Sequence, residues 1–545
     1  MAKETSASEP ISARDDHEHY TCIVMGAGFS GMATAIQLKR KFGLEDVLVY
    51  EKTDDVGGYD LERESAIQLY PGAASDIPIT FYSFSFYPAY RVKSDWASQP
   101  LIKEYLHEVR DKFHLDNVVY RTAVEEARFS RADGLWHLKV KDLVTGQIRS
   151  RTCNILFACL GGLTVPQDPP FDPAAFTGEI FHTAQWPKEY NLTGKDVVVV
   201  GNGCSAAQIV PEICHTAKTV TQVARSRQAY LPRPPLPEGP LIRLLIKYIW
   251  GIGWLLRTAM FFVMEQGFIA SDIVRGAKDR ANLSKIITKY IQAGSPNRYW
   301  DVLEPDHEVS AKRRVYDMGY IRSLNEPNVE LIADDVVVRA EGDKVYTRGG
   351  RELRADVVVL ATGFKVRDYM FPLKIINSEG ESFQERMDHT GSKVFQGTVV
   401  SSFPNLFILM GPNTTTGHSS VVFTSECQLS LAFHMIRPVL EALRDNRNGG
   451  GGNETEPPKP APYVEVKRAA EDARYAELRK EMKKKTWETN HGVSWYTDKR
   501  SGLCTALYPW SQIHFWRRCT FPDYGDFKWS HCARGAVWRS WLGFY

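Results

Sequence analysis

The chain has 545 residues, of which 43% are hydrophobic and 24% charged, and its formal net charge is +2. These values are typical of a globular protein of about two to four domains, and the balanced charge excludes the basic footprint of a nucleic-acid-binding protein. The nine cysteines are an odd number without a CxxC pair, so we expect reduced thiols in a cytoplasmic protein and no metal site.

The chain begins with a polar, charged stretch without the apolar run of a signal peptide, so we predict a loose tail over residues 1–19. Residues 20–25 (YTCIVM) then predict a strand. This strand leads into a glycine-rich turn at residues 26–31 (GAGFSG), a stretch with helical spacing, and a second strand at Val47–Tyr50. Glu51 follows directly.

This β–turn–α–β unit indicates a dinucleotide site. Glycine is needed at 26 for a tight turn, at 28 for close approach to a pyrophosphate, and at 31 for helix–strand packing. The helix N-terminus faces the phosphates with partial positive charge, and Glu51 can bind a ribose hydroxyl. The residues assigned to this first site are Gly26, Gly28, Phe29, Ser30, Gly31, Glu51, Lys52 and Gly58.

A second unit of the same kind lies downstream. A four-valine run at 197–200 enters residues 201–206 (GNGCSA), a variant of the fingerprint that ends in alanine. Its next strand, Thr219–Val223, is followed by residues 224–227 (ARSR) and not by an acid. An arginine there suits the 2′-phosphate of NADPH, although ordinary surface charges are the alternative. The residues assigned to the second site are Gly201, Gly203, Ser205, Ala206, Arg225 and Ser226.

Two dinucleotide sites on one chain fit FAD near the N-terminus and NADPH downstream, and the pairing implies hydride transfer to a flavin. We therefore predict an α/β fold with two Rossmann-like domains. The FAD-binding domain would comprise residues 20–170 and 385–545, and the NADPH-binding domain residues 171–384 with a helical insert at about 235–300. Residues 445–462 are polar and low in complexity, which predicts a flexible loop.

Within the insert, Leu241–Phe262 is rich in apolar residues but is interrupted by Arg243, Lys247 and Arg257. Its longest uncharged run is far shorter than the roughly 18–20 residues that a spanning helix needs. We predict a buried or partly exposed helix, with a helix on a membrane surface or along a substrate-access route as the alternative.

The stretch between the two units carries a more specific pattern. Residues 176–187 (FTGEIFHTAQWP) match the fingerprint FxGxxxHxxxW(P/D), and the chain resembles the Baeyer–Villiger monooxygenases on this basis. Related flavin-containing and N-hydroxylating monooxygenases usually lack the tryptophan. Further segments that resemble the family lie at 70–78, 311–313, 361–364, 403–407, 411–413, 494–496 and 508–509. Ser75, where the family usually has cysteine, looks more fungal than bacterial.

The resemblance implies a reaction. NADPH would reduce FAD, oxygen would add to give a flavin C4a-peroxide, and attack on a small hydrophobic ketone would give an ester or lactone. Arg313 would sit over the flavin as a permanent cation, with Asp76 as its carboxylate partner. Lys312 would join Arg225 at the 2′-phosphate, and Trp495 would lie near the nicotinamide ribose. Thr362 and Gly363 would lie at the hinge between the nucleotide domains and contact cofactor.

The fingerprint itself is expected to be a hinge. Phe176, Gly178, Trp186 and Pro187 would pack within the linker, and we favour a structural role for His182 over one as general base. One segment departs from the family. After Gly58 the usual tryptophan is missing, and the loop Tyr59–Leu69, which normally lies beside the flavin ring, is longer.

Other functions stay open. An N- or S-oxygenating flavin monooxygenase or an uncoupled NADPH oxidase would share both sites, and a non-enzymatic flavoprotein would fit the unusual loop. A pyridine-nucleotide disulfide reductase is disfavoured because no cysteine occurs between Cys22 and Cys153. We expect a monomer or weak oligomer.

Overall fold

The computed structural model describes residues 18–532 except 58–64, 67–69, 90–95, 188–189, 235–243, 247, 250, 367–369, 449–458, 490–493 and 499. Most of the predicted tail, Gly58, and the loop Tyr59–Leu69 apart from Ser65 and Ala66 therefore lie outside the described residues.

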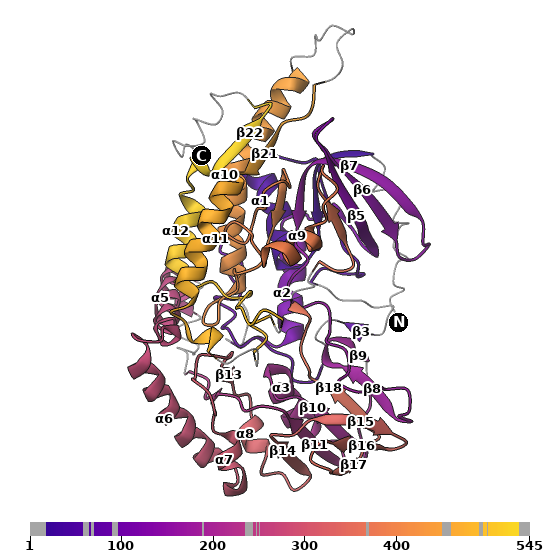
Figure 1. Cartoon of the computed structure of the whole chain (residues 1–545), viewed down its shortest axis with the longest axis vertical. Coiled ribbons are helices and arrows are strands. Elements are labelled where there is room, and N and C mark those ends of the chain that lie inside the picture. Colours follow the sequence, from indigo (N-terminus) through magenta and orange to yellow (C-terminus); the bar gives the residue numbers. More distant parts are fainter. Residues whose placement is uncertain are drawn as a thin grey trace.

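The first glycine-rich unit belongs to an eight-stranded sheet in the upper half of Figure 1, with strand order β19-β5-β6-β7-β1-β2-β4 and β20 paired with β7. Strand β1, which enters the first glycine turn, lies parallel to both β2 and β7. The strands are β1 (His19–Met25), β2 (Val47–Tyr50), β4 (Val118–Val119), β5 (Thr122–Ser130), β6 (Leu135–Asp142), β7 (Ile148–Ala158), β19 (Lys374–Ile376) and β20 (Leu406–Ile408).

Two helices cover this sheet. α1 (Phe29–Phe42) begins after Gly28 and ends at Gly43, which adopts the left-handed conformation with φ 61°. The long helix α10 (Val421–Asn448) packs beside α1. It continues through residues 445–448, so the prediction that the flexible loop begins at 445 was wrong. The buried side of α10 anchors the helix up to Ala442, and one further turn costs little once a helix is formed.

The second glycine-rich unit belongs to a five-stranded, fully parallel sheet in the lower half of Figure 1, with strand order β14-β11-β10-β18-β8. Its central strand, β10, is the predicted valine run and is entirely buried. Helix α3 (Cys204–Ile213) follows it. The strands are β8 (Glu179–His182), β10 (Asp196–Val200), β11 (Thr219–Ala224), β14 (Val329–Ala333) and β18 (Val357–Leu360).

The predicted insert contains α5 (Ile252–Gln266) and α6 (Ala277–Gly294), followed by α7 (Trp300–Leu303), at the lower left of Figure 1. No helix among the described residues is long and apolar enough to cross a membrane. The other helices are α2 (Gln99–Lys112), α8 (Tyr320–Ser323), α9 (Phe383–Thr390), α11 (Arg468–Met482) and α12 (Gln512–Thr520). The other strands are β3 (Ser65–Ala66), β9 (Trp186–Pro187), β12 (Tyr230–Leu231), β13 (Val315–Tyr316), β15 (Val337–Glu341), β16 (Lys344–Thr347), β17 (Glu352–Arg354), β21 (Tyr463–Val466) and β22 (Phe527–Ser530).

Strands of both sheets end at a common cavity. The carboxyl ends of β1 and β2 in the large sheet and of β10 and β11 in the small sheet all border the same cavity. This edge of a parallel α/β sheet is where such folds bind ligands. The domain boundaries stay predictions.

Candidate functional site

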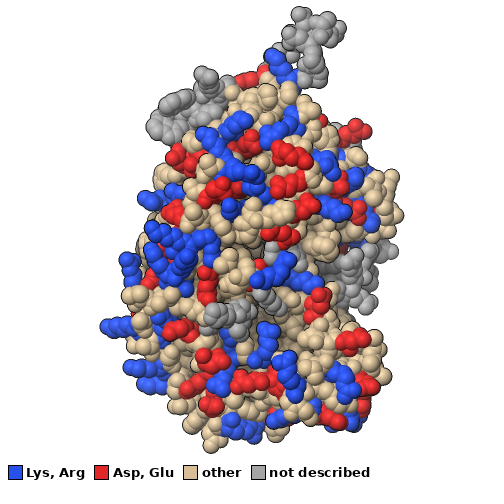
Figure 2. Space-filling model, in the orientation of Figure 1, with Lys and Arg blue, Asp and Glu red and all other residues tan. Residues whose placement is uncertain are grey.

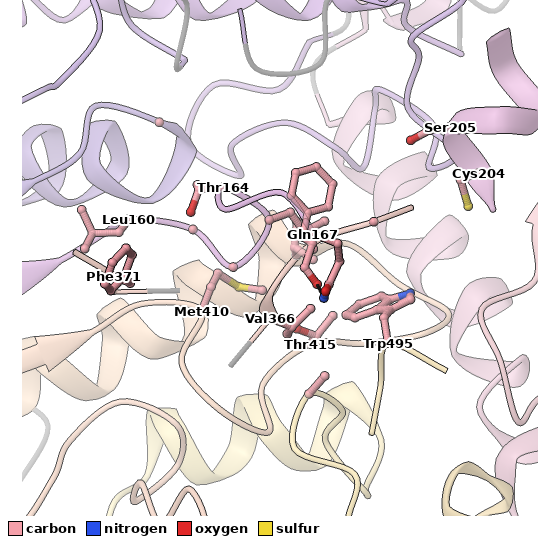
Figure 3. Close-up of a pocket in the computed structure, with 18 of the residues that line it drawn as sticks. Leu160, Thr164, Gln167, Cys204, Ser205, Val366, Phe371, Met410, Thr415 and Trp495 are labelled. Carbon is pink, nitrogen blue, oxygen red and sulfur yellow. Dashed lines mark hydrogen bonds between the residues drawn. The ribbon is translucent and has the colours of Figure 1, made fainter. Parts of the chain in front are cut away.

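A cavity of about 1690 Å³ lies between the two glycine-rich turns. Figure 3 shows part of its lining, from Leu160 and Phe371 on one side to Cys204 and Ser205, at the start of α3, on the other. Trp495 and Thr415 lie between them. The cavity is large enough to bind more than a single small ligand.

The first turn requires glycine at two of its positions for steric reasons. At Gly26 φ is 99°, and a Cβ there would lie 2.6 Å from the carbonyl oxygen of Cys159. A Cβ at Gly31 would lie 1.7 Å from the carbonyl oxygen of Gly26. A Cβ at Gly28 would meet nothing within 4 Å and would occupy the cavity instead. The turn is therefore packed against the protein on one side and open to a ligand on the other.

Glu51 directly follows β2, and its buried carboxylate holds the turn in place. Its Oε2 accepts a hydrogen bond of 2.7 Å from the backbone of Ala27, and its Oε1 accepts bonds from the backbone and hydroxyl of Thr53. The same side chain lines the cavity, where a ribose hydroxyl could donate to it.

The second turn repeats the arrangement. Gly201 has φ 118°, and a Cβ there would lie 2.4 Å from the carbonyl oxygen of Ala361. A Cβ at Gly203 would meet nothing within 4 Å. Gly28 and Gly203 are the N-cap residues of α1 and α3, and neither helix has a side-chain cap. Both helices thus present uncapped N-terminal amides to the cavity, as pyrophosphate binding requires.

Unpaired polar atoms in the cavity wall also fit a polar ligand. The Oε1 atom of Gln228 and the hydroxyls of Thr362 and Ser419 are buried without a hydrogen-bond partner among the described residues. Buried polar atoms in native proteins are nearly always paired. Two dinucleotides, each with phosphates, sugar hydroxyls and rings that form hydrogen bonds, would supply partners.

A group of cations follows the second turn. Arg225, at the end of β11, is exposed and lines the cavity, whereas Arg227 bonds to Asp334 and to the backbone of Asp301. Lys312 is buried and donates to the backbone oxygen of Arg227. Burial lowers the pKa of the Lys312 ammonium, and the nearby Arg225 lowers it further against the pull of Asp306. Arg225 and Lys312 therefore offer positive charge at the place expected for a 2′-phosphate.

One ion pair at the cavity wall joins two distant parts of the chain. Both Nε and Nη2 of Arg313 donate to Oδ2 of Asp76, with the Nε bond at 3.1 Å. Burial opposes the charge of the guanidinium, but Asp76, together with Cys204 and Tyr496, raises the pKa of Arg313 well above its usual value. Tyr82 lies beside the pair, and its pKa is raised to about 12 by burial and by Asp76. The result is a permanent cation at the cavity wall.

The fingerprint residues lie outside the wall. Trp186 is buried and packs on Phe181 with ring centroids 4.9 Å apart. His182 ends β8, next to Phe364 of the predicted hinge, with ring centroids 5.5 Å apart. Its Nδ1 accepts from the backbone of Ala184, and its buried Nε2 has no hydrogen-bond partner of normal geometry among the described residues. These contacts support packing at the linker.

Burial lowers the pKa of His182 to about 4, so the ring is neutral at neutral pH. The unfolded chain binds this proton near pH 6.5 and the folded chain only near pH 4, so folding loses stability as pH falls through this window. We expect His182→Gln to reduce the drop in Tm between about pH 7 and pH 5. Thermal scans of the wild type, this variant and the exposed control His215→Gln check it. An unchanged drop in His182→Gln contradicts the prediction.

The structure brings most of the predicted site residues to one cavity. Those at its wall are Gly26, Gly28, Phe29, Ser30, Glu51, Lys52, Asp76, Gly201, Gly203, Ser205, Arg225, Ser226, Lys312, Arg313, Thr362, Gly363 and Trp495. Gly31 and Ala206 are instead buried beneath the two turns. Sequence reasoning missed other wall residues, among them Tyr82, Gln167, Val366, Met410 and Thr415. Met410, Thr415 and Val366 lie within two residues of the family segments 411–413 and 361–364, which could have pointed to them, whereas Tyr82 and Gln167 lie on loops without a motif.

Similarity to known proteins extends over most of the chain. Residues 20–234 match the family described as flavin-binding monooxygenase-like. An FAD-binding monooxygenase, BOA2, of Botryotinia fuckeliana is 30% identical over 441 residues, covering 78% of this chain and 80% of that protein. A Baeyer–Villiger monooxygenase of Pseudomonas aeruginosa is 29% identical over 506 residues, covering 92% and 89%.

Among solved structures, an oxidized steroid monooxygenase bound to NADP superimposes with a TM-score of 0.75 and 23% identity, covering 94% of this chain and 99% of that one. This likeness confirms the predicted α/β fold with two Rossmann-like units.

Proposed function

The chain belongs to the flavin-binding monooxygenase-like family, and on that premise we propose that it is an FAD-dependent, NADPH-consuming Baeyer–Villiger monooxygenase. The observation that carries the proposal is the ion pair of Arg313 and Asp76 at the wall of a cavity that both glycine turns border. The match of residues 176–187 to the Baeyer–Villiger fingerprint and the relative of that name support the same reaction.

The residues at the wall fit both cofactors. The N-terminus of α1 and Glu51 would hold the pyrophosphate and a ribose of FAD, and the N-terminus of α3 would hold the pyrophosphate of NADPH. When bound, the two cofactors supply hydride transfer and activation of oxygen. The protein supplies position, charge and exclusion of water.

Arg313 would act on the substrate oxygen. Insertion of oxygen beside a ketone carbonyl places negative charge on the carbonyl oxygen, and a preorganised cation in a partly dry site stabilises that charge. Asp76 is a positioning residue here because it binds two nitrogens of the guanidinium and fixes its plane. The high pKa of Arg313 keeps the cation charged throughout.

Arg225 should set the preference for NADPH. We expect Arg225→Ala to raise KM for NADPH about tenfold or more, the effect of losing one charged hydrogen bond, with little change in kcat. Arg227→Ala is the matched control, since Arg227 bonds to Asp334 and Asp301. Steady-state kinetics with NADPH and NADH check this. If Arg225→Ala prefers NADPH over NADH as strongly as the wild type, Arg225 does not bind the 2′-phosphate.

We propose a hydrophobic ketone as substrate. The part of the cavity wall drawn in Figure 3 includes the apolar side chains of Leu160, Val366, Phe371 and Met410. We also propose that the chain acts in the cytoplasm as a monomer or weak oligomer, and its nine free cysteines fit a reducing compartment.

The direct test is a product screen. The FAD-loaded protein is given NADPH, air and linear, cyclic and aryl ketones, with a thioether in parallel, and the products are identified. The proposal expects NADPH consumption that rises with a ketone and an ester or lactone as product. Efficient oxidation of the thioether without ester from any ketone would show an S-oxygenating enzyme instead.

A further inference from the structure

Exposed apolar side chains are concentrated in one part of the chain. More than half of the large hydrophobic residues that are exposed in the described chain lie between Leu244 and Ile286. On α5 itself, Trp254 is 67% exposed, Leu255 57%, Phe262 52% and Val263 72%. We refer to these four residues as the apolar face of α5. Contiguous exposed apolar surface of this kind marks an interaction site.

Both charged residues of α5 are buried, whereas four of its large apolar side chains are exposed, the reverse of an ordinary surface helix. The buried residues of α5 are Gly253, Arg257 and Glu265. Arg257 donates to the backbone oxygens of Thr80, at 2.5 Å, and Ser83, at 3.0 Å. An amphipathic helix in water buries its apolar stripe and exposes its charges. On α5 the two charged side chains are buried while Trp254 and Val263 face solvent.

This orientation is fixed by contacts to the rest of the protein. Glu265 pairs with the buried His418 at 3.1 Å, and its other oxygen accepts from the backbone of Ile513, at the start of α12. Phe261 packs on Phe423, with ring centroids 5.0 Å apart. Because burying a charge unpaired is costly, rotation of α5 to hide its apolar face would lose these contacts.

Exposed cations lie near the start of α6, the helix that follows α5. Arg275, Lys278 and Lys285 are exposed on and before α6, and Lys483 and Lys484 are exposed where the backbone of Lys484 accepts from Ile273. Figure 2 shows lysines and arginines gathered along the left edge of the molecule, where α5 and α6 lie in Figure 1. Lysine is depleted at protein–protein interfaces, but it is attracted to the negative surface of anionic lipids.

We propose that α5 docks the protein on an anionic phospholipid surface, with Trp254, Leu255, Phe262 and Val263 inserted among the lipid chains and the lysines at the head groups. The helix would lie in the plane of the surface, and its 15 residues do not span a bilayer. Its inner side contacts Thr80, Ser83 and Phe423, and the adjacent residues Tyr82 and Val422 line the cavity. The cavity would thus lie near the source of an apolar substrate.

Vesicle sedimentation tests the docking. The full-length, FAD-loaded chain is mixed with vesicles of phosphatidylcholine alone or with about one third phosphatidylserine, which gives a negative surface. We expect binding to the anionic vesicles and much weaker binding to the neutral ones. The double variant Trp254→Gln/Phe262→Gln should lower the partition coefficient about tenfold or more because it removes two apolar anchors.

Two controls separate this surface from general stickiness. Val144→Gln changes a residue that is 56% exposed on the turn between β6 and β7, and it should bind like the wild type. Lys278→Gln/Lys285→Gln should weaken binding to anionic vesicles only. Wild-type protein left in the supernatant, or a Trp254→Gln/Phe262→Gln variant that binds fully, overturns the proposal. A third result also overturns it: the wild type does not bind vesicles but self-associates, and the Trp254→Gln/Phe262→Gln variant stays monomeric. That result would identify the apolar face of α5 as a contact between copies of the chain.

The docking does not depend on the reaction proposed above. The substituted side chains are exposed, so each variant should fold like the wild type. Retained FAD in the purified variant checks this. Vesicle binding without any ester product would leave the docking intact and refute only the proposed reaction. Ester formation without vesicle binding would support the proposed reaction and refute only the docking.

Discussion

The variant Arg313→Ala should retain FAD and oxidise NADPH but lose ester formation by about a hundredfold or more, the scale seen when a preorganised charge-stabilising group is removed. The cofactors would be bound by the glycine turns and by Glu51. Arg313 belongs to neither, so its loss should leave cofactor binding intact. What the variant removes is the cation at the cavity wall, together with the partner of Asp76. Product yield per NADPH consumed is the measurement.

Two further variants sharpen this result. Arg313→Lys keeps the charge but loses the fork that donates twice to Asp76, so we expect partial activity. Arg351→Ala removes an exposed arginine paired with Glu330 and should be neutral. Normal ester yield from Arg313→Ala would show that the cation plays no part in the reaction.

Gly31→Ala should give a protein that does not retain FAD. The added Cβ would lie 1.7 Å from the carbonyl oxygen of Gly26, so either α1 or the turn must move. Both consequences destroy the arrangement of uncapped helix amides and the turn that a pyrophosphate needs. The absorbance of bound flavin in the purified protein and its Tm measure the effect.

Gly28→Ala is the matched comparison. Its Cβ would meet no protein atom within 4 Å and would enter the cavity. We expect the protein without cofactor to keep its Tm while FAD binding weakens. The comparison separates loss of the turn's structure, expected for Gly31→Ala, from obstruction of the ligand, expected for Gly28→Ala. Equal flavin content in Gly31→Ala and the wild type would mean that the first turn does not hold FAD.

The two glycine turns could be predicted because all the residues that matter are contiguous. A strand, a turn, a helix and an acid follow one another within residues 20–51, and local sterics determine where glycine is required. Arg313 and Asp76 are 237 residues apart, so only the resemblance to a family could pair them. The structure then supplied the geometry that the sequence lacks, in which two nitrogens donate to a single oxygen.

Other features depend on tertiary contacts. The apolar content of Leu241–Phe262 favours a buried or partly exposed helix. The inward orientation of Arg257 and Glu265 follows from hydrogen-bond partners on distant segments and cannot be read from periodicity. Of the unusual loop Tyr59–Leu69, the two described residues form β3, which pairs with β9 at the end of the fingerprint. Nothing in the local sequence of either segment specifies that pairing.

Oxygen labelling tests the central claim most directly. The FAD-loaded protein is supplied with NADPH, isotopically labelled oxygen gas and a hydrophobic ketone, and the product is analysed by mass spectrometry. The proposed function predicts an ester or lactone that contains one labelled oxygen atom, with one NADPH consumed for each product molecule. Consumption of NADPH that yields hydrogen peroxide and unchanged ketone, across the whole ketone panel, would contradict it.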